Sequence, residues 1–303
     1  RSSRVGSAPV RVQALAPISF RVLPMEVYGR PGGEIRMRVS VTNTFRENVA
    51  GTFHIVPPDG WRSADPRPYN LDVGDTDEFE TVCTVPGSVD PGTFEAVAVF
   101  SYGEMEFSTA VPIHVRDYPT AESTPIDISQ LFNSDLFTRE SDFADVDNFG
   151  GPFSYPAGYY PSDTEIEYLG VRFAFPSTEN DTDNAVRVDG QRVSVPRGRY
   201  DRLALLTVAT NGDKRVAFTL RYADGARETR EIVITDWCRT VKYDEVPVER
   251  APYRHYPPGI LRDCEPQIMM QTIPVDPRKR LEAIEFPRKT DFWVVAATLT
   301  TDR

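Results

Sequence analysis

The segment Val188–Cys238, VDGQRVSVPRGRYDRLALLTVATNGDKRVAFTLRYADGARETREIVITDWC, decides the fold of this chain. Apolar and polar residues alternate along its short runs, and a turn signal stands at nearly every junction. The turn signals are Gly190, Pro196-Arg197-Gly198, Asn211-Gly212 and Ala223-Asp224-Gly225. This rhythm predicts roughly five or six short antiparallel strands joined by tight turns.

The run AFTLRY, residues 217–222, shows the alternation most clearly. Phe218, Leu220 and Tyr222 should share one face of a strand, and the polar residues between them should share the other. A half-buried strand requires this period of two. Charged residues in and beside the segment are accordingly interpreted as the solvent faces of strands: Arg187, Arg192, Arg221 and Arg230.

Length and composition limit the classes of protein to consider. With 303 residues the chain is long enough for two domains, and its 26 prolines and 19 glycines favour loops and edge strands over long helices. The formal net charge of −11 argues against nucleic acid and anionic membrane surfaces as partners. No apolar run approaches the roughly 20 residues that span a bilayer, so we expect no membrane insertion.

The chain begins at Arg1, with neither an initiating methionine nor a signal peptide, so we expect a processed chain or a piece of a longer one. The spacing of strand and turn signals along the chain predicts an all-β protein with an N-terminal immunoglobulin-like β-sandwich and a C-terminal jelly-roll β-sandwich. The predicted parts are an N-terminal arm (1–17), the immunoglobulin-like domain (18–117), a linker (118–125) and the jelly-roll domain (126–303).

The first half carries turn and strand signals in a recognisable order. Its strand EIRMRVSV alternates Ile35, Met37, Val39 and Val41 on one face. The signals are Pro31-Gly32, Thr42-Asn43, Pro58-Asp59-Gly60-Trp61 and Pro91-Gly92-Thr93-Phe94. Together they resemble the immunoglobulin-like NEW3 domain associated with alpha-galactosidases. The resemblance covers about a third of the chain, and it implies a spacer or accessory beside a sugar-acting catalytic domain.

The second half resembles the galactose-binding-like jelly-roll modules appended to bacterial glycoside hydrolases. The features that carry this resemblance are Phe132-Asn133, Phe149-Gly150-Gly151, Tyr155-Pro156-Ala157, Gly170-Val171-x-Phe173, Gly190-Gln191, Tyr222-Ala223-Asp224-Gly225 and Asp236-Trp237. It implies a sugar-associated, non-catalytic module whose partner is a carbohydrate or a glycoside hydrolase domain.

Two acidic loops are candidates for a structural Ca²⁺, because calcium takes six to eight oxygen ligands in irregular geometry. A solvated acidic loop has the same sequence appearance, and the spacing is not that of an EF-hand. A pair of these carboxylates acting as a glycosidase acid and base lacks a surrounding active-site frame. The candidate ligands are Asp142, Asp145 and Asp147 in the first loop, with Asp181 and Asp183, beside Glu179, in the second.

Two aromatic loops are candidates for binding carbohydrate, since flat rings stack on sugar C–H groups. The candidates are Tyr155, Tyr159 and Tyr160 in the first loop, and Tyr253, Arg254 and Tyr256 in the second. The alternative is that the first loop plugs the open end of the jelly roll and the second is a proline-rich loop packed on its own side chains. Trp61 and Trp237, at strand ends, are interpreted as structural.

The cysteines and histidines point to no catalytic site. Cys238 and Cys264 either form a disulfide that closes a loop of about 25 residues or remain two buried thiols. Cys83 is interpreted as a buried apolar residue. The three histidines are scattered, and neither GxSxG nor HExxH occurs, so we expect no enzymatic activity.

Two hypotheses of function follow. The first is a secreted, non-catalytic pair of β-sandwiches, extracellular or at the cell surface, that binds or presents carbohydrate. The second is a structural subunit of an extracellular filament or surface assembly, in which residues 1–17 donate a strand to a neighbouring copy of the chain.

Overall fold

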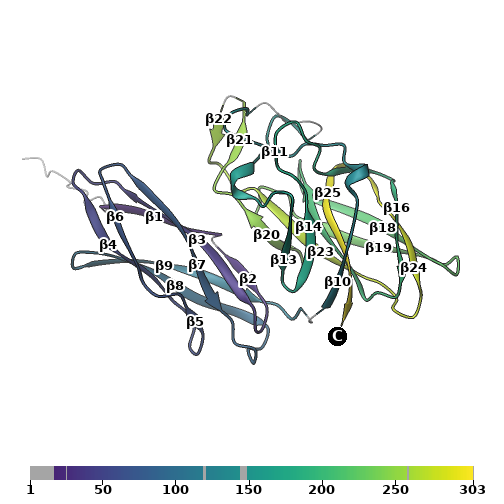
Figure 1. The fold of residues 1–303 in the computed structure, drawn as a ribbon, viewed down its shortest axis with the longest axis horizontal. Coiled ribbons are helices and arrows are strands. Elements are labelled where there is room, and N and C mark those ends of the chain that lie inside the picture. The colour runs from purple at the N-terminus through teal and green to yellow at the C-terminus, as the bar shows by residue number, and fades with distance from the viewer. Residues whose placement is uncertain (1–16, 25, 119–120, 144–148, 258, 303) are drawn as a thin grey trace, which may run out of the picture. The chain divides into compact units, whose positions relative to one another are not determined.

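The computed structural model describes residues 17–24, 26–118, 121–143, 149–257 and 259–302. Regular structure in these residues is almost entirely β-strand, with two short 3-10 helices, η1 (Ser129–Leu131) and η2 (Ala157–Tyr159) (Figure 1). This confirms the all-β fold class. In the described part of the chain, no helix has the length and apolar character needed to cross a membrane.

The chain forms two compact units. The first draws on described residues within 1–25, 36–83 and 95–112, and the second on those within 26–35, 84–94 and 113–303. Because short N-terminal ranges are grouped with the second unit, the single boundary expected at residue 117 stays a prediction. We describe the sheets of the two halves of the chain separately.

Strands β1 to β9 form two sheets (Figure 1). One has the order β1 (Ile18–Leu23), β3 (Glu34–Asn43), β7 (Thr76–Thr84) and β5 (Arg62–Ser63). The other has the order β2 (Val27–Gly29), β9 (Met105–Val115), β8 (Gly92–Tyr102), β4 (Val49–Val56) and β6 (Arg67–Leu71). In β3 the alternation is as predicted, because Ile35, Met37, Val39 and Val41 are all buried.

Aromatic rings join these two sheets into a sandwich. Phe100 of β8 stacks on Phe20 of β1 with ring centroids 4.0 Å apart. Phe53 of β4 packs against both Phe100 at 4.8 Å and Phe79 of β7 at 5.1 Å. These contacts cross from one sheet to the other, and they place the core between the alternating faces of the strands.

Gly51 is the tightest backbone approach in this sandwich. It lies in β4 between Tyr69 of β6 and Tyr102 of β8. The Tyr69 hydroxyl donates a hydrogen bond of 2.7 Å to the Ser101 carbonyl across Gly51. A Cβ added to Gly51 would lie 1.8 Å from that carbonyl oxygen. Glycine is therefore required here by space.

The second half contains two main sheets and three short strand pairs (Figure 1). A six-stranded sheet has the order β10 (Ala121–Ile126), β25 (Arg288–Asp302), β17 (Arg202–Ala209), β23 (Gln267–Pro274) and β20 (Val246–Arg250), with β15 (Val186–Asp189) also paired to β25. A four-stranded sheet has the order β16 (Arg192–Gly198), β24 (Leu281–Glu285), β18 (Lys214–Tyr222) and β19 (Arg227–Ile234). Short pairs are β11 (Phe137–Thr138) with β12 (Tyr155–Pro156), β13 (Thr164–Tyr168) with β14 (Val171–Phe175), and β21 (Arg254–Tyr256) with β22 (Gly259–Leu261).

Strand β10 overlaps the segment 118–125 that we predicted as a linker. It pairs antiparallel with β25 from Ala121↔Asp302 to Ile126↔Ala297. Two prolines, small polar residues and little apolar content suggested a linker, but β10 is an outer strand of the six-stranded sheet, where proline is tolerated. Residues 121–125 are therefore part of the sheet.

Strand β17, RLALLTVA, is buried on both faces. Leu203 and Leu205 belong to one apolar cluster, which fills the space between the six- and four-stranded sheets. Ala204 and Leu206 belong to a second cluster with the aromatic loop of residues 149–160. The six-stranded sheet is thus covered on both sides, and a continuous apolar run is the pattern expected of such a strand. Strand β18 keeps the predicted alternation, with Phe218, Leu220 and Tyr222 buried.

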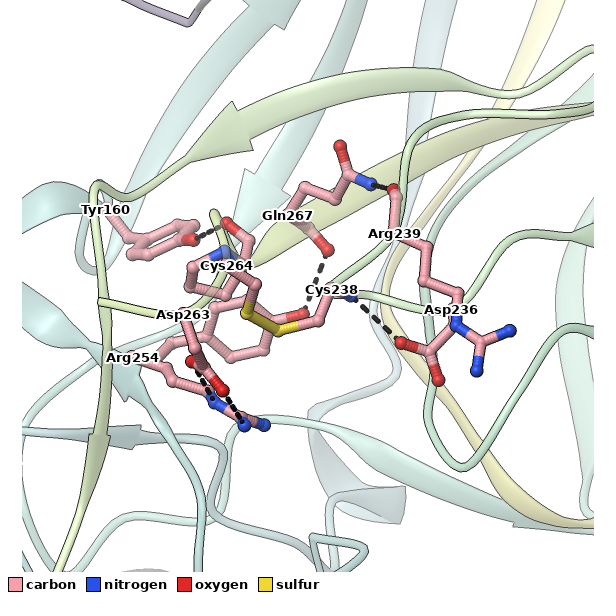
Figure 2. The surroundings of a disulfide bond; sticks show 10 residues. Tyr160, Asp236, Cys238, Arg239, Arg254, Asp263, Cys264 and Gln267 are labelled. Atoms are coloured by element: carbon pink, nitrogen blue, oxygen red, sulfur yellow. Dashed lines mark hydrogen bonds and ion pairs between the residues drawn. A yellow bond between two sulfur atoms is a disulfide. The ribbon is translucent and has the colours of Figure 1, made fainter. Parts of the chain in front are cut away.

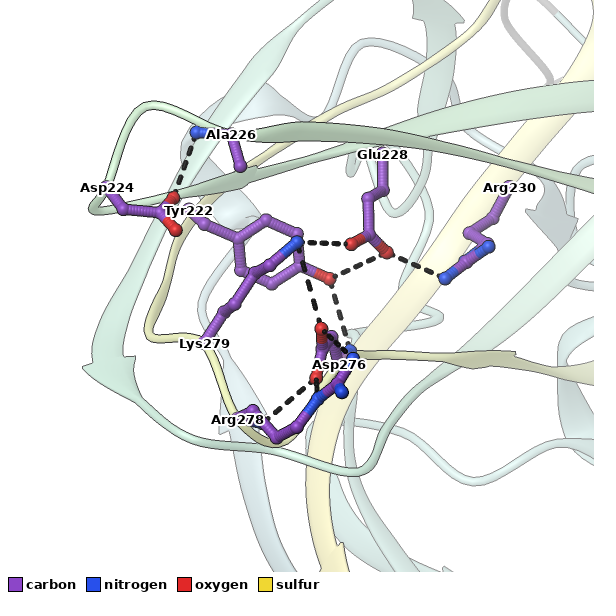
Figure 3. A network of polar contacts seen from close by, with 8 residues as sticks. All are labelled: Tyr222, Asp224, Ala226, Glu228, Arg230, Asp276, Arg278 and Lys279. Atoms are coloured by element: carbon purple, nitrogen blue, oxygen red, sulfur yellow. Dashed lines mark hydrogen bonds and ion pairs between the residues drawn. The ribbon is translucent and has the colours of Figure 1, made fainter.

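A polar network closes one end of the four-stranded sheet (Figure 3). The Glu228 carboxylate of β19 accepts hydrogen bonds from Lys279 at 2.8 Å and from the Tyr222 hydroxyl at 3.3 Å. The same hydroxyl accepts a hydrogen bond of 3.1 Å from the Asp276 amide. These contacts join the hairpin β18–β19 to the loop that precedes β24. Surface ion pairs contribute only about 0–1 kcal/mol each, so the network mainly fixes the geometry of the loop.

We predict that Gly51→Ala destabilises the N-terminal sandwich by about 3 kcal/mol or more, because the backbone of β8 must move to admit the methyl group. Hydrogen–deuterium exchange of the slowest amides of β4, β6 and β8 should accelerate by about 100-fold. Gly87→Ala is the control, since a Cβ there meets no heavy atom within 4 Å. Equal exchange in the two variants would show that the contact is relaxed in solution.

Candidate functional site

A cleft of about 260 Å³ opens where two turns of the second half meet the aromatic loop. It is lined by Phe149, Gly150, Phe153, Thr210, Asn211, Gly212, Asp236, Trp237, Cys238, Arg239 and Arg254. The turn Asn211-Gly212 joins β17 to β18, and the turn that contains Asp236 and Trp237 follows β19. We call this the disulfide cleft, because Cys238 in its wall is disulfide-bonded.

The two turns are fastened to each other by Asp236. Its Oδ2 accepts a hydrogen bond of 2.7 Å from the Gly212 amide, and its Oδ1 accepts one of 3.0 Å from the Cys238 amide. The Trp237 amide donates to the Ala209 carbonyl at 2.8 Å. Thr210 forms the buried floor, and a Cβ added to Gly150 would lie 2.4 Å from its Oγ1. This floor therefore needs the glycine at position 150.

Arg254 is fixed on the other side of the cleft (Figure 2). Its Nε and Nη2 donate to the two carboxylate oxygens of Asp263 at 3.0 and 2.6 Å. Its guanidinium lies 3.7 Å from the ring centroid of Phe153, which is half-buried. The two parallel hydrogen bonds fix the orientation of the planar guanidinium, so Arg254 packs on the Phe153 ring in a defined position.

Cys238 and Cys264 form a disulfide beside this pair, 26 residues apart in the sequence (Figure 2). The segment that it closes contains β20, β21 and β22 and therefore carries Arg254. The Gln267 amide donates to the Trp237 carbonyl at 2.9 Å next to the bond. The disulfide thus ties the turn after β19 to the start of β23. Cys83 is a free, buried thiol, and burial raises its pKa to about 11.

The aromatic residues that we predicted as a sugar-binding surface are largely in the core. Tyr155, Tyr160 and Tyr253 are 0%, 7% and 6% exposed. The Tyr155 and Tyr160 hydroxyls donate to the carbonyls of Gln267 and Pro266, both at 2.9 Å. We predicted that these three rings stack on a sugar, but rings buried to this extent are not accessible to a ligand. The Tyr155 and Tyr160 rings belong to the apolar cluster that covers the second face of the six-stranded sheet, and Tyr253 packs against Tyr159 and His255.

The other predicted binding residues are partly accessible. Tyr159 is half-buried and meets the edge of Tyr253 at 5.3 Å. Tyr256 is half-buried, and its ring centroid is 6.3 Å from that of Phe153. Of the six residues that we predicted, Arg254 lines the disulfide cleft.

His255 lies in a buried polar network that the sequence did not reveal. Its Nδ1 is 2.9 Å from the Thr138 Oγ1, which in turn is 2.6 Å from the Ser154 Oγ. All three side chains are almost completely buried. The imidazole packs against the Phe143 ring at 4.7 Å and the Tyr253 ring at 5.6 Å. Burial lowers its pKa, so the neutral imidazole ties β21 to β11 and the residue before β12.

The predicted calcium ligands do not form a site in the described residues. Asp142, Asp181 and Asp183 are exposed, and the Glu179 carboxylate pairs with Arg139. No group of three or more His, Cys, Asp or Glu side chains that could hold a metal ion occurs in the part of the chain that the structure describes. Asp145 and Asp147 lie outside those residues, so the calcium hypothesis stays a prediction.

Most residues of the disulfide cleft were not predicted as site residues. Asn211 was predicted as part of a turn, Asp236 was a feature of the resemblance to jelly-roll modules, and Trp237 was interpreted as structural. Arg239 carried no sequence signal. The turn residues share one property that the sequence does show: each follows the end of a predicted strand. Binding sites on rigid scaffolds concentrate in such loops.

The fold and this cleft define a β-sandwich with a small aromatic and polar cleft at the ends of its strands. A model of the AziU2-like beta-sandwich domain matches residues 122–303, more than half of the chain, and the chain belongs to this family. No curated protein sequence matches it.

Solved structures show limited similarity to the chain. A family 123 glycoside hydrolase from Clostridium perfringens, studied for glycolipid glycan hydrolysis, is 7% identical over 34% of this chain and 28% of that chain, with a TM-score of 0.27. PapD-like domain 7 of human CEP192 is 9% identical to this chain, and the match covers 39% of this chain and 98% of that chain, with a TM-score of 0.27. E. coli alpha-2-macroglobulin is 11% identical to this chain, and the match covers 64% of this chain and 9% of that chain, with a TM-score of 0.30.

We predict that removing the disulfide, in Cys238→Ser/Cys264→Ser, lowers the free energy of unfolding by about 3 kcal/mol, because the unfolded chain regains the entropy of the closed loop. Urea denaturation of the two proteins measures the difference. Dithiothreitol should destabilise the wild type by the same amount and leave the variant unchanged. Equal midpoints with and without reductant in the wild type would contradict the prediction.

We predict that His255 makes stability fall in mild acid. The unfolded imidazole has a pKa near 6.5 and the folded one a lower value, so the unfolded state binds the proton more readily. The free energy of unfolding should therefore decrease as pH falls below about 6.5, until the folded pKa is passed. Thermal unfolding between pH 7 and 5 measures this slope. His255→Gln should flatten it, and His54→Gln, in the other sandwich, should not.

Proposed function

We propose that the chain is a secreted, non-catalytic β-sandwich protein that binds carbohydrate in the disulfide cleft as an accessory module. One observation carries the proposal. The half-buried Phe153 ring, fixed by Arg254, shares a cleft with the side chains of Asn211 and Arg239. Within the described residues these two polar groups form no side-chain hydrogen bond or ion pair. The cleft therefore combines an aromatic ring with polar groups that are available to a ligand.

This combination suits a sugar more than an apolar ligand. A sugar ring presents C–H groups to an aromatic face and hydroxyl groups at its rim. An exposed amide both donates and accepts hydrogen bonds, and a guanidinium donates several. The cleft volume of about 260 Å³ is at the small end of ligand sites, which favours one terminal sugar unit over a long chain bound in a groove.

The non-catalytic part of the proposal rests on the surroundings of the possible reactive groups. The hydroxyl–imidazole series Ser154, Thr138 and His255 has the residue types of a nucleophile and its base, yet all three are inaccessible to substrate. In the disulfide cleft the Asp236 carboxylate is occupied by two backbone amides. A carboxylate held this way serves the architecture of the turns.

The wider proposal draws on the resemblances stated for the sequence. Similarity to the NEW3 domain and to galactose-binding-like jelly rolls supports attachment to a glycoside hydrolase and an extracellular or cell-surface location. A structural Ca²⁺ belongs to the same proposal. Assembly with copies of the chain through the N-terminal arm is the alternative, and residues 1–16 of that arm lie outside the described residues.

We predict that a glycan array and affinity gels identify at least one glycan that binds the full chain. Phe153→Ala and Arg239→Ala should each weaken that binding by about tenfold, the value of one aromatic or charge-assisted contact. Phe45→Ala, which truncates an exposed ring of the N-terminal sandwich, is the matched control and should bind normally. Absence of binding to every glycan, with or without Ca²⁺, would refute the proposal.

A further inference from the structure

A second and larger cleft lies at an edge of the six-stranded sheet. Its volume is about 570 Å³, and its lining residues are Asn133, Arg187, Val188, Asp189, Arg288, Lys289 and Thr290. We call it the basic cleft, because three of its seven lining residues are cationic. From the sequence we interpreted Arg187 as a solvent-facing strand residue, whereas it is half-buried in this wall.

The basic cleft exists because β15 and β25 separate locally. Arg187 pairs with Trp293, and Asp189 pairs with Arg288. Val188 of β15 therefore stands opposite the four residues 289–292 of β25, a local irregularity in the pairing of these two strands. Such irregularities redirect side chains and are frequent beside functional sites. Here the irregularity directs Lys289 and Thr290 to the wall of the cleft.

Two further residues determine where the arginines lie. The Asn133 Oδ1 accepts a hydrogen bond of 2.7 Å from the Arg187 amide, which fixes the backbone of β15. Gly190 adopts a φ of +78°, and a Cβ there would lie 2.7 Å from the Arg288 Nε. The Arg288 side chain thus runs across the bare backbone of Gly190. The turn Gly190-Gln191 is built to admit this arginine.

The three cations of the basic cleft have no carboxylate partner in the described residues. Neither Arg187, Arg288 nor Lys289 takes part in an ion pair there. Several other cations of the same half are paired, including Arg202 with Asp302, Arg221 with Glu285, Lys279 with Glu228 and Arg254 with Asp263. What distinguishes the basic cleft is that its three unpaired cations line one concavity. In a chain with a formal net charge of −11, acidic partners are abundant. Three unpaired cations in one concavity therefore indicate an anionic ligand.

We propose that the basic cleft binds a small hydroxylated carboxylate of the kind that a uronic acid residue presents. Arg288 and Arg187 offer planar N–H groups that match a carboxylate. The Asp189 carboxylate and the Thr290 hydroxyl line the same space and accept hydrogen bonds from ligand hydroxyls. A simple anion such as sulfate has no hydroxyl donor to offer Asp189.

The overall charge decides between a small ligand and a polyanion. A net charge of −11 repels nucleic acid and other polyanions at long range, whereas a single carboxylate experiences mainly the local cations. The site is separate from the disulfide cleft, and no residue lines both. Its occupation therefore goes beyond the carbohydrate binding proposed above for the disulfide cleft.

The test is an NMR titration of the full chain with sodium glucuronate, with glucose and sodium sulfate as separate probes. Glucuronate should shift the amides of residues 187–190 and 288–290, and glucose should leave them unchanged. Arg288→Ala/Lys289→Ala should weaken glucuronate binding by about tenfold or more, as expected for loss of charge-assisted contacts. Arg227→Ala, which removes an exposed and unpaired arginine of β19, should bind like the wild type.

Each other outcome overturns the assignment. Equal shifts with glucose would remove the role of the carboxylate. Sulfate that competes fully and binds at least as tightly would reduce the cleft to a general anion site. Binding of an acidic peptide without glucuronate would assign a protein partner, and no shift with any probe would leave the cleft without a ligand function. Phe153→Ala should not alter glucuronate binding, so failure here and failure of the disulfide cleft are separable.

Discussion

The burial of the six-stranded sheet on both faces is the constraint on which the rest of the second half depends. Strands β17 and β25 bring apolar side chains to each face, and neither face can remain open to water. The four-stranded sheet covers one face. The loops around residues 149–160 cover the other with Phe149, Tyr155 and Tyr160. Because this loop supplies three aromatic residues to the core, its main role is to cover the sheet, although its sequence resembles that of a ligand-binding loop.

This covering layer also explains the polar chemistry beneath it. Backbone carbonyls and hydroxyl groups buried by a loop must find partners within the protein, because an unpaired buried group costs about 1–3 kcal/mol. The Tyr155 and Tyr160 hydroxyls donate to carbonyls, and the Trp293 indole donates to the Ser134 Oγ at 3.1 Å. Thr138 Oγ1 and His255 Nδ1 pair in the same way, whereas the buried His255 Nε2 has no hydrogen-bond partner in the described residues. Exposed polar side chains, among them Asn211 and Arg239, lie instead at the rim, where the turns after β17 and β19 meet.

The sequence predicted the parts of the fold that depend on local pattern. The alternation of Phe218, Leu220 and Tyr222 and of Ile35 to Val41 follows from the period of a strand. The candidate site was harder to predict, because exposure of a tyrosine depends on what the other strands bring against it. Arg254 was anticipated as a binding residue, whereas Asn211, Arg239 and Phe153 join it only through contacts between segments far apart in the chain.

The sequence by itself determined an all-β chain, the strand alternation and the turns, since these follow from side-chain period and backbone preferences within a few residues. Tertiary structure alone decided that Cys238 meets Cys264 and that segment 121–126 is a strand. It also decided that Arg187, Arg288 and Lys289 face one concavity. The physical reason is that pairing, burial and charge neutralisation are relations between distant residues, and a single residue's neighbours in sequence do not specify them.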